Sequence, residues 1–160
     1  MDDMLSLTTH LPAVTVPAGE TVIREGGIDR TIWVLERGVL NVRKGGMVVN
    51  VISQAGAVVG EISVLLGTPY GADVETATDC VLRRADDGAA LLASHPAITS
   101  LVAAGLAERL NFVTSYLVDL KHQYGDAPGL AMIPDVLREL SQRQRPKAQP
   151  GSMRDPDPEY

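Results

Sequence analysis

The chain has 160 residues, a length that favours one domain with a core large enough to fold unaided. Its 14 Lys and Arg against 20 Asp and Glu give a formal charge of −6, which argues against a nucleic-acid-binding surface, since such a surface needs clustered basic residues. The single cysteine cannot form an internal disulfide, and no secretory signal or apolar run of membrane-spanning length is present, so we expect a soluble cytoplasmic protein with no membrane partner.

Residues 1–10 are predicted to form a short helical segment. From residue 11 the sequence changes to short runs of strand-forming residues separated by glycines. Strands are expected at residues 13–16, 21–23, 31–35, 39–43, 47–52, 72–77 and 80–84, with a hairpin turn at residues 44–46. Because the connections before residue 86 are too short for the helices of a βαβ fold, this spacing predicts a rolled antiparallel β-structure.

Residues 56–74 are the stretch around which the other elements are arranged. Two valines precede Gly60-Glu61, about one turn of helix is expected next, and Pro69 precedes a returning strand. A glycine allows a close approach of backbone or ligand, N–H groups at a helix start favour an anion, and Glu61 can accept from hydroxyls. A glutamate in a first helical turn is equally explained by the helix dipole, so this pair alone is a weak signal of a ligand site.

Two helices are predicted after the strands. Asp86 is expected to cap a short helix to Ala93, and Ser94 to cap a long helix that runs from Pro96 to about Tyr124. A heptad-like seam in the long helix is formed by Leu106, Leu110, Val113, Leu117 and Leu120. The seam suits a homodimer through this helix, and the alternative is an ordinary core stripe against the β-structure.

The last part of the chain is predicted to form a short helical appendage, residues 125–144, followed by a disordered tail, residues 145–160. The appendage is based on Ile133, Leu137 and Leu140 at helical spacing. The tail contains prolines among charged and small residues, and it could recruit a protein partner.

A glycine framework runs through the β-rich part of the chain. Its members are Gly19, Gly26, Gly38, Gly56 and Gly60 followed by Glu61. With the strands between them and the long helix after them, residues 11–124 resemble the cyclic-nucleotide-binding domain of the catabolite-activator, kinase-regulatory-subunit and ion-channel families. The resemblance implies an eight-stranded antiparallel β-roll (jelly-roll), a short helix in a phosphate-binding cassette, and a long C-terminal helix that covers the purine and often forms the dimer.

The resemblance also implies roles for individual residues. Gly60 would bring its backbone close to the ligand, and Glu61 would accept the ribose 2′-hydroxyl. Residues 62–66 would form the cassette helix facing the cyclic phosphate, and Ala72 would present its backbone N–H at the end of the cassette. The ligand-binding residues implied in this way, including three of the long helix near the purine edge, are Gly60, Glu61, Ile62, Ser63, Tyr70, Gly71, Ala72, Arg109, Thr114 and Ser115.

The sequence departs from the family pattern at Tyr70, where the cassette normally has an arginine that binds the phosphate bidentately. A tyrosine can donate one neutral hydrogen bond to the phosphate. Such a bond contributes roughly 0.5–2 kcal/mol less than a charged one, which predicts an affinity about two- to thirty-fold lower. Asp73 would weaken anion binding further if its side chain faces the pocket. Arg83 and Arg84 point to opposite sides of a regular strand, so either could replace the missing cation.

Two functions remain open. The first is a regulatory ligand-sensing module that binds cAMP or cGMP weakly or atypically, and the alternative is a homodimeric interaction or adaptor domain that has lost nucleotide binding. We do not expect an enzyme, a cofactor or a metal site, because His10, His95 and His122 are scattered and no nucleophile has a base at useful spacing. Direct DNA binding is not expected either, because no segment after the long helix has the charge of a recognition helix.

Overall fold

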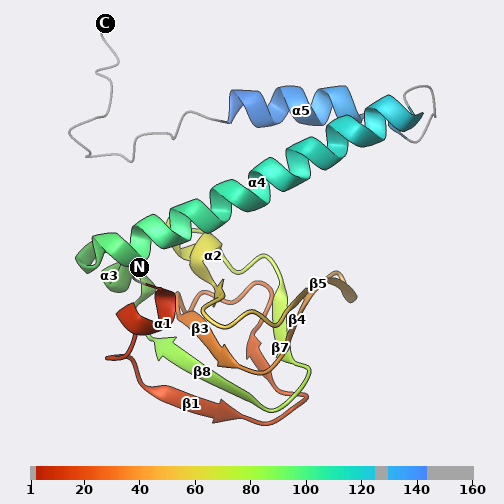
Figure 1. Cartoon of the computed structure of the whole chain (residues 1–160). Helices are drawn as coiled ribbons and strands as arrows, with labels where there is room; N and C mark the ends of the chain where they lie inside the picture. Colours follow the sequence, from red (N-terminus) through yellow and green to blue (C-terminus); the bar gives the residue numbers. More distant parts are fainter. Residues whose placement is uncertain (1–2, 125–129, 144–160) are drawn as a thin grey trace, which may run out of the picture. The chain divides into compact units, whose positions relative to one another are not determined.

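The computed structural model describes residues 3–124 and 130–143 (Figure 1). They form two compact units, which divide between Leu106 and Ala107. The predicted helix break at residues 125–128 and the predicted tail at residues 145–160 lie outside the described residues. Among the described residues no single helix has the length and apolar character of a membrane-spanning segment, although the bent pair of helices Gly88–Ser94 and Pro96–Tyr124 meets that criterion by length and composition alone.

The first unit contains two antiparallel sheets of four strands each, which confirms the predicted β-roll. The strands are β1 (Ala13–Val16), β2 (Thr21–Ile23), β3 (Ile32–Arg37), β4 (Leu40–Lys44), β5 (Met47–Ile52), β6 (Val58–Val59), β7 (Asp73–Thr76) and β8 (Cys80–Ala85). One sheet has the order β1-β8-β3-β6 and the other the order β2-β7-β4-β5. Strands distant in the sequence are therefore neighbours in both sheets, as in a jelly roll.

The main core lies between the two sheets. Leu35 and Leu82 from the first sheet and Leu40 from the second are fully buried, and they belong to one cluster with Trp33 and Val74. Inward-facing and outward-facing residues alternate along β7 and along most of β8, which is the pattern of strands with one buried face.

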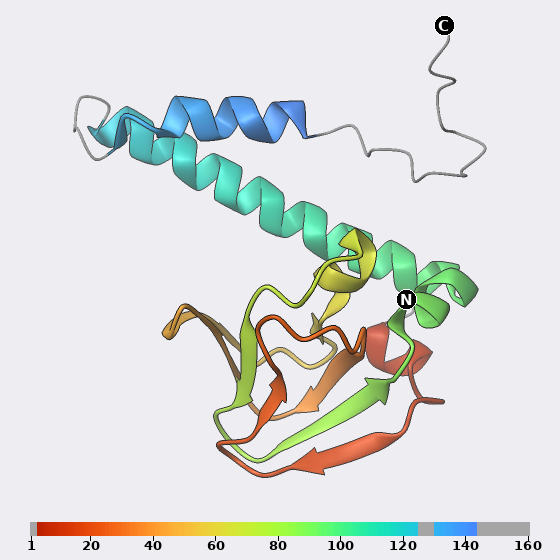
Figure 2. The ribbon, with the colours of Figure 1, turned by 180° about the vertical axis from the view of Figure 1, so that it is seen from behind.

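A second core cluster is covered by helices. It joins Ile32 and Val34 of β3 to residues of α1 (Met4–Leu7), α2 (Glu61–Leu66), α3 (Gly88–Ser94) and the first turns of α4 (Pro96–Tyr124). Figure 2 shows α1 and α3 close to the ends of β3 and β8. These helices bury apolar side chains that the sheet alone would expose to water.

Helix α1 is held to β8 by Arg83. The Arg83 guanidinium donates to the Leu5 carbonyl, to the Thr8 hydroxyl at 3.2 Å and to the Glu36 carboxylate at 2.9 Å. At the other end of α1, the Asp3 carboxylate accepts from the Ser6 N–H at 2.7 Å, a cap that lowers the pKa of Asp3 below 3.8.

The two predicted helix caps were wrong. Asp87 caps α3 by accepting from the Ala90 N–H at 2.9 Å, whereas Asp86 forms an ion pair with Arg84 at 2.6 Å. The Ser94 hydroxyl donates to the Ala90 carbonyl at 2.6 Å, so it ends α3 and does not cap α4. Adjacent aspartates satisfy the same cap pattern in a sequence, and the end of β8 decides which one is used.

The edge strand β5 exposes apolar side chains along its length. Its members Met47, Val48, Val49 and Val51 are all exposed, and the register shift against β4 leaves Val49 as a bulged residue. No charged residue occurs between Lys44 and Glu61. The free side of β5 is thus an uncharged edge that has no strand partner among the described residues.

The second unit contains the later turns of α4 and helix α5 (Ile133–Gln142). Both ribbon views show α5 beside this part of α4 (Figures 1 and 2), and Ile133 is buried. On α4, Leu110 and Val113 are exposed, and Phe112 and Tyr116 form an exposed stacked pair with centroids 6.4 Å apart. The dimer seam stays a prediction.

Candidate functional site

Tyr70 lies inside the fold, in the turn between α2 and β7, with 5% of its surface exposed. Its ring fits between two glycines, since a Cβ built on Gly27 would lie 3.2 Å from Cδ2 and one built on Gly60 would lie 3.4 Å from Cε1. Its hydroxyl donates to the Thr31 carbonyl at 2.8 Å. The residue at the expected arginine position is therefore a packed core residue whose hydroxyl proton already has an acceptor.

Gly60 must be a glycine for two separate reasons. Its φ of +92° is a conformation that side chains of L-residues rarely adopt. In addition, a Cβ at this position would lie 2.5 Å from the Thr31 carbonyl oxygen. The close backbone approach expected from the sequence exists, and in this structure it is made to the β2–β3 connection.

The Tyr70 hydroxyl is held in its neutral form. Burial is the largest cause that raises the pKa of Tyr70 above 10.0, and the negative charge of Asp29 raises it further, against the opposite effect of the Thr31 hydrogen bond. A neutral phenol that donates to a backbone carbonyl contributes no positive charge to the cassette.

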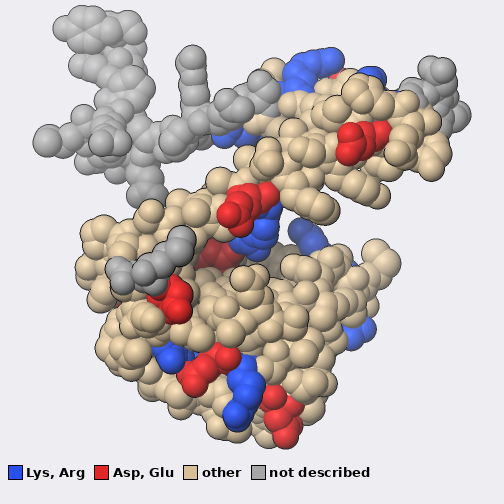
Figure 3. Space-filling view, in the orientation of Figure 1, with Lys and Arg blue, Asp and Glu red and all other residues tan. Residues whose placement is uncertain are grey.

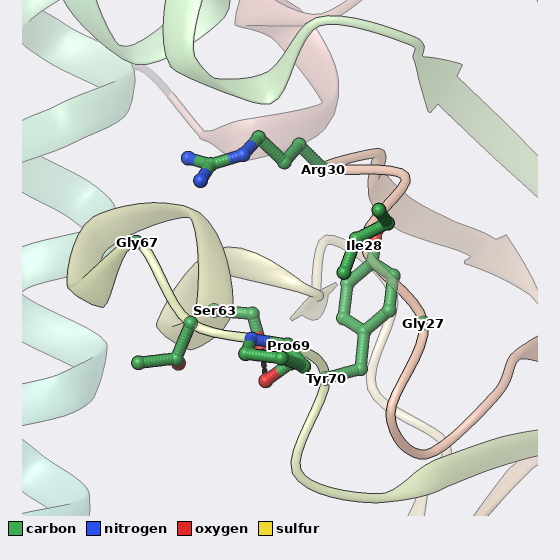
Figure 4. A pocket seen from close by; sticks show the side chains of 8 residues that line it. Gly27, Ile28, Arg30, Ser63, Gly67, Pro69 and Tyr70 are labelled. Carbon is green, nitrogen blue, oxygen red and sulfur yellow. Dashed lines mark hydrogen bonds between the residues drawn. The ribbon is translucent and has the colours of Figure 1, made fainter.

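A small pocket opens beside Tyr70, between the β2–β3 connection and the turn after α2 (Figure 4). Its volume is about 60 Å³. The residues that line it are Gly27, Ile28, Arg30, Ser63, Gly67, Thr68, Pro69 and Tyr70. Pockets for whole ligands usually enclose roughly 300–1,000 Å³, so this one has room for a small polar group and the rest of any nucleotide would lie outside it.

Arg30 is the charged residue of the lining, and the sequence did not indicate it. Among the described residues it is the only non-glycine with a positive φ, +59°. Figure 4 shows its side chain extending from the β2–β3 connection towards α2. A basic residue in a connection between two strands has no local pattern that marks it as a ligand, because only the fold brings this connection beside α2.

The predicted cassette residues have different positions in the structure. Ser63 lines the pocket and donates its hydroxyl to the Pro69 carbonyl at 3.3 Å, whereas Ile62 is exposed. Glu61 is 3% exposed in the first turn of α2. The N–H groups of Gly71 and Ala72 have no acceptor among the described residues.

The other charged candidates near the cassette are engaged elsewhere. The Asp73 carboxylate accepts from the Glu25 N–H at 2.7 Å and does not line the pocket. Arg83 binds α1 and Glu36, and Arg84 pairs with Asp86 and lies over the Trp33 ring at 5.5 Å. Neither arginine of β8 replaces the missing cation in this pocket.

Arg109, Thr114 and Ser115 belong to the second unit, on the later turns of α4, where Thr114 is half-buried and the other two are exposed. Among the described residues no group of three or more His, Cys, Asp or Glu side chains could hold a metal ion. On the face shown in Figure 3, acidic and basic side chains of the β-roll are interspersed and form no large basic patch.

Comparison with solved structures identifies proteins of the same fold. PKAR CBD2 with bound Sp-2Cl-cAMPS is 20% identical over 75% of this chain and 80% of that chain, with a TM-score of 0.56. A structure from a cyclic-GMP-dependent signalling pathway that regulates bacterial phytopathogenesis is 16% identical over 67% of this chain and 91% of that chain, also with a TM-score of 0.56. At these identities the likeness shows the fold.

The regulatory domain of Toxoplasma gondii PKA, solved with cAMP, is 28% identical over 49% of this chain, with a TM-score of 0.45. This chain spans 31% of the length of that structure. Residues 13–91 match the family model of the cyclic nucleotide-binding domain, a range that contains all eight strands, α2 and the pocket. The chain thus contains, over residues 13–91, a match to the cyclic nucleotide-binding domain family.

Proposed function

We propose that this chain is a regulatory module, not an enzyme, and that it binds a cyclic nucleotide, cAMP or cGMP, with reduced affinity. The observation that carries the proposal is the pocket formed where α2 and its following turn meet the β2–β3 connection. The family match over the β-roll supports the same conclusion.

The proposed contacts are those of the family pattern at the positions where this sequence has the residues of that pattern. Glu61 would accept the ribose 2′-hydroxyl, and the N–H groups of Gly71 and Ala72, which have no acceptor among the described residues, are available to a phosphate oxygen. Arg109, Thr114 and Ser115 are proposed for the purine edge. Reduced affinity is expected because the Tyr70 hydroxyl is neutral and bound to Thr31.

The experiment is a thermal-shift and calorimetric titration of the full chain with cAMP and cGMP up to millimolar concentration. A ligand that binds only the folded state stabilises it by about 2.7 kcal/mol at a hundred times its dissociation constant, so even weak binding raises the melting temperature measurably. 5′-AMP is the matched control, because it keeps the base, ribose and phosphate but lacks the cyclic ester. If neither cyclic nucleotide shifts the melting temperature or gives a heat of binding, the proposal is wrong.

The second candidate is a homodimeric interaction domain, and the exposed apolar residues of α4 favour it. Leu110, Val113 and the Phe112–Tyr116 pair are exposed in the second unit, and burying them in a dimer would be favourable. Residues 145–160 are proposed to recruit a protein partner. The buried thiol of Cys80 is consistent with the proposed cytoplasmic location.

Sedimentation equilibrium tests the dimer. Val113→Glu would place a charge in the seam and dissociate it, whereas Asn111→Glu adds the same charge at an exposed position outside the five seam residues. A wild-type chain that sediments as a monomer at all concentrations contradicts the dimer. A Val113→Glu variant that remains dimeric contradicts the seam as the interface of that dimer.

A further inference from the structure

Arg30 has a backbone conformation that is unfavourable for an arginine. A φ of +59° is seldom adopted by residues other than glycine, asparagine and aspartate. Its carbonyl accepts from the Gly88 N–H at 3.1 Å, which ties the connection to the start of α3. A strained conformation of this kind persists only where the surrounding structure holds it, and such conformations are frequent at binding sites.

The Arg30 side chain is not explained by a contact within the protein. Its guanidinium has no hydrogen bond or ion pair among the described residues. It lines the pocket with the neutral groups of Ser63, Thr68 and Tyr70, and no carboxylate is among the lining residues. Asp29, next in the chain, lies outside this lining. A positive charge therefore lines a small pocket that has no carboxylate among its lining residues, although the Asp29 carboxylate lies close to Gly27.

We propose that Arg30 binds the phosphate group of the ligand, and that it supplies from the β2–β3 connection the positive charge that Tyr70 lacks within the cassette. This inference rests on the proposed function and names the cation of the same site. The pocket of about 60 Å³ has room for one compact group such as a phosphate and is too small for a whole nucleotide. A guanidinium is also the side chain best matched to phosphate oxygens.

The first test compares cAMP with adenosine, which lacks the phosphate, by calorimetry on the full chain. Wild type is expected to bind cAMP more tightly than adenosine. Arg30→Gln should weaken cAMP binding about ten- to hundred-fold, the range that one or two charged hydrogen bonds represent, and leave adenosine binding unchanged. Arg24→Gln is the matched control, because Arg24 is an exposed arginine of the same connection that does not line the pocket.

A second variant separates binding from structure. Arg30→Gly removes the side chain and also relieves the positive φ, so the ligand-free variant should melt at a higher temperature than wild type. The same variant should bind cAMP as weakly as Arg30→Gln. A residue with only a structural role would change stability without this loss of the preference for cAMP over adenosine.

The outcomes distinguish this inference from the proposed function. If wild type binds cAMP and Arg30→Gln binds it equally well, the phosphate role of Arg30 is wrong and the proposed function stands. If wild type binds neither cyclic nucleotide, the proposed function fails. A thermal-shift titration with inorganic phosphate at constant ionic strength then tests whether the pocket binds an anion. A stabilisation by phosphate that Arg30→Gln abolishes supports an anion site for another phosphate source, and no stabilisation overturns it.

Discussion

At the scale of single residues, Tyr70 shows how one exchange changes both charge and packing. The ring fills space between Gly27 and Gly60, and the hydroxyl binds the Thr31 carbonyl at 2.8 Å. The turn after α2 is therefore fastened to the β2–β3 connection by a neutral contact. The contact contributes to stability, and it keeps the phenol from serving as a phosphate donor without rearrangement.

Tyr70→Phe should lower the free energy of unfolding by about 0.5–1.5 kcal/mol, because it removes one buried hydrogen bond and leaves the Thr31 carbonyl unpaired. Urea denaturation measures the change, and Tyr116→Phe, at an exposed position, should have almost no effect. Equal losses in the two variants would contradict a special role for the Thr31 contact.

The same hydroxyl predicts a pH dependence. Because burial raises the pKa of Tyr70 above 10.0, the unfolded chain loses this proton first as the pH rises. The corresponding stability is fully present below pH 10.0 and is lost as the pH rises through the pKa of the folded state. Wild type should lose more stability above pH 10.0 than Tyr70→Phe does, and parallel urea curves of the two proteins would contradict this.

Gly60→Ala should destabilise the protein far more than Gly19→Ala. Both glycines have positive φ values, so each substitution carries a strain of about 1–2 kcal/mol, but only Gly60 would bring a Cβ to 2.5 Å from the Thr31 oxygen. Overpacking adds about 1–3 kcal/mol at Gly60. Similar melting temperatures for the two variants would show that the Thr31 connection moves away easily.

At the scale of elements, the strands were largely predictable and the helix caps were not. Short β-branched runs ended by glycines mark strands locally, and seven of the eight described strands agree with the predicted ranges within about two residues at each end. The two-residue strand β6 had no predicted range of its own. The choice of Asp87 over Asp86 depends on where β8 ends, and the role of Arg30 depends on a connection folding beside α2. The cap is a local contact for which two adjacent aspartates fit the pattern, whereas the position of Arg30 beside α2 brings together residues distant in the sequence, which no local pattern contains.

The clamp between α1 and β8 gives a prediction for an element. Arg83→Met should cost about 1.5–3 kcal/mol, because the Leu5 carbonyl and Glu36 lose a charged donor. Arg84→Met, which removes an exposed ion pair, should cost about 0–1 kcal/mol. Hydrogen exchange at the Leu7 and Thr8 amides should accelerate only in the first variant, and unchanged protection there would contradict the clamp.

At the scale of the whole molecule, Cys80 reports on global unfolding. It is the only cysteine of the chain and is 1% exposed, and its thiol contacts the Val39 and Thr78 carbonyls. A thiol reagent should label the folded protein only as fast as the β-roll opens. Labelling in native buffer should therefore slow under conditions that stabilise the protein, and rapid labelling independent of urea would contradict a closed roll.

Strand β5 has a practical consequence for work with this protein. Its valine-rich outer edge is free of charge and bulged at one residue only, so two molecules that meet edge to edge encounter little repulsion. We expect concentrated stocks and refolding mixtures to aggregate first through this edge. A lysine introduced at Val49 would protect such samples without touching the cassette.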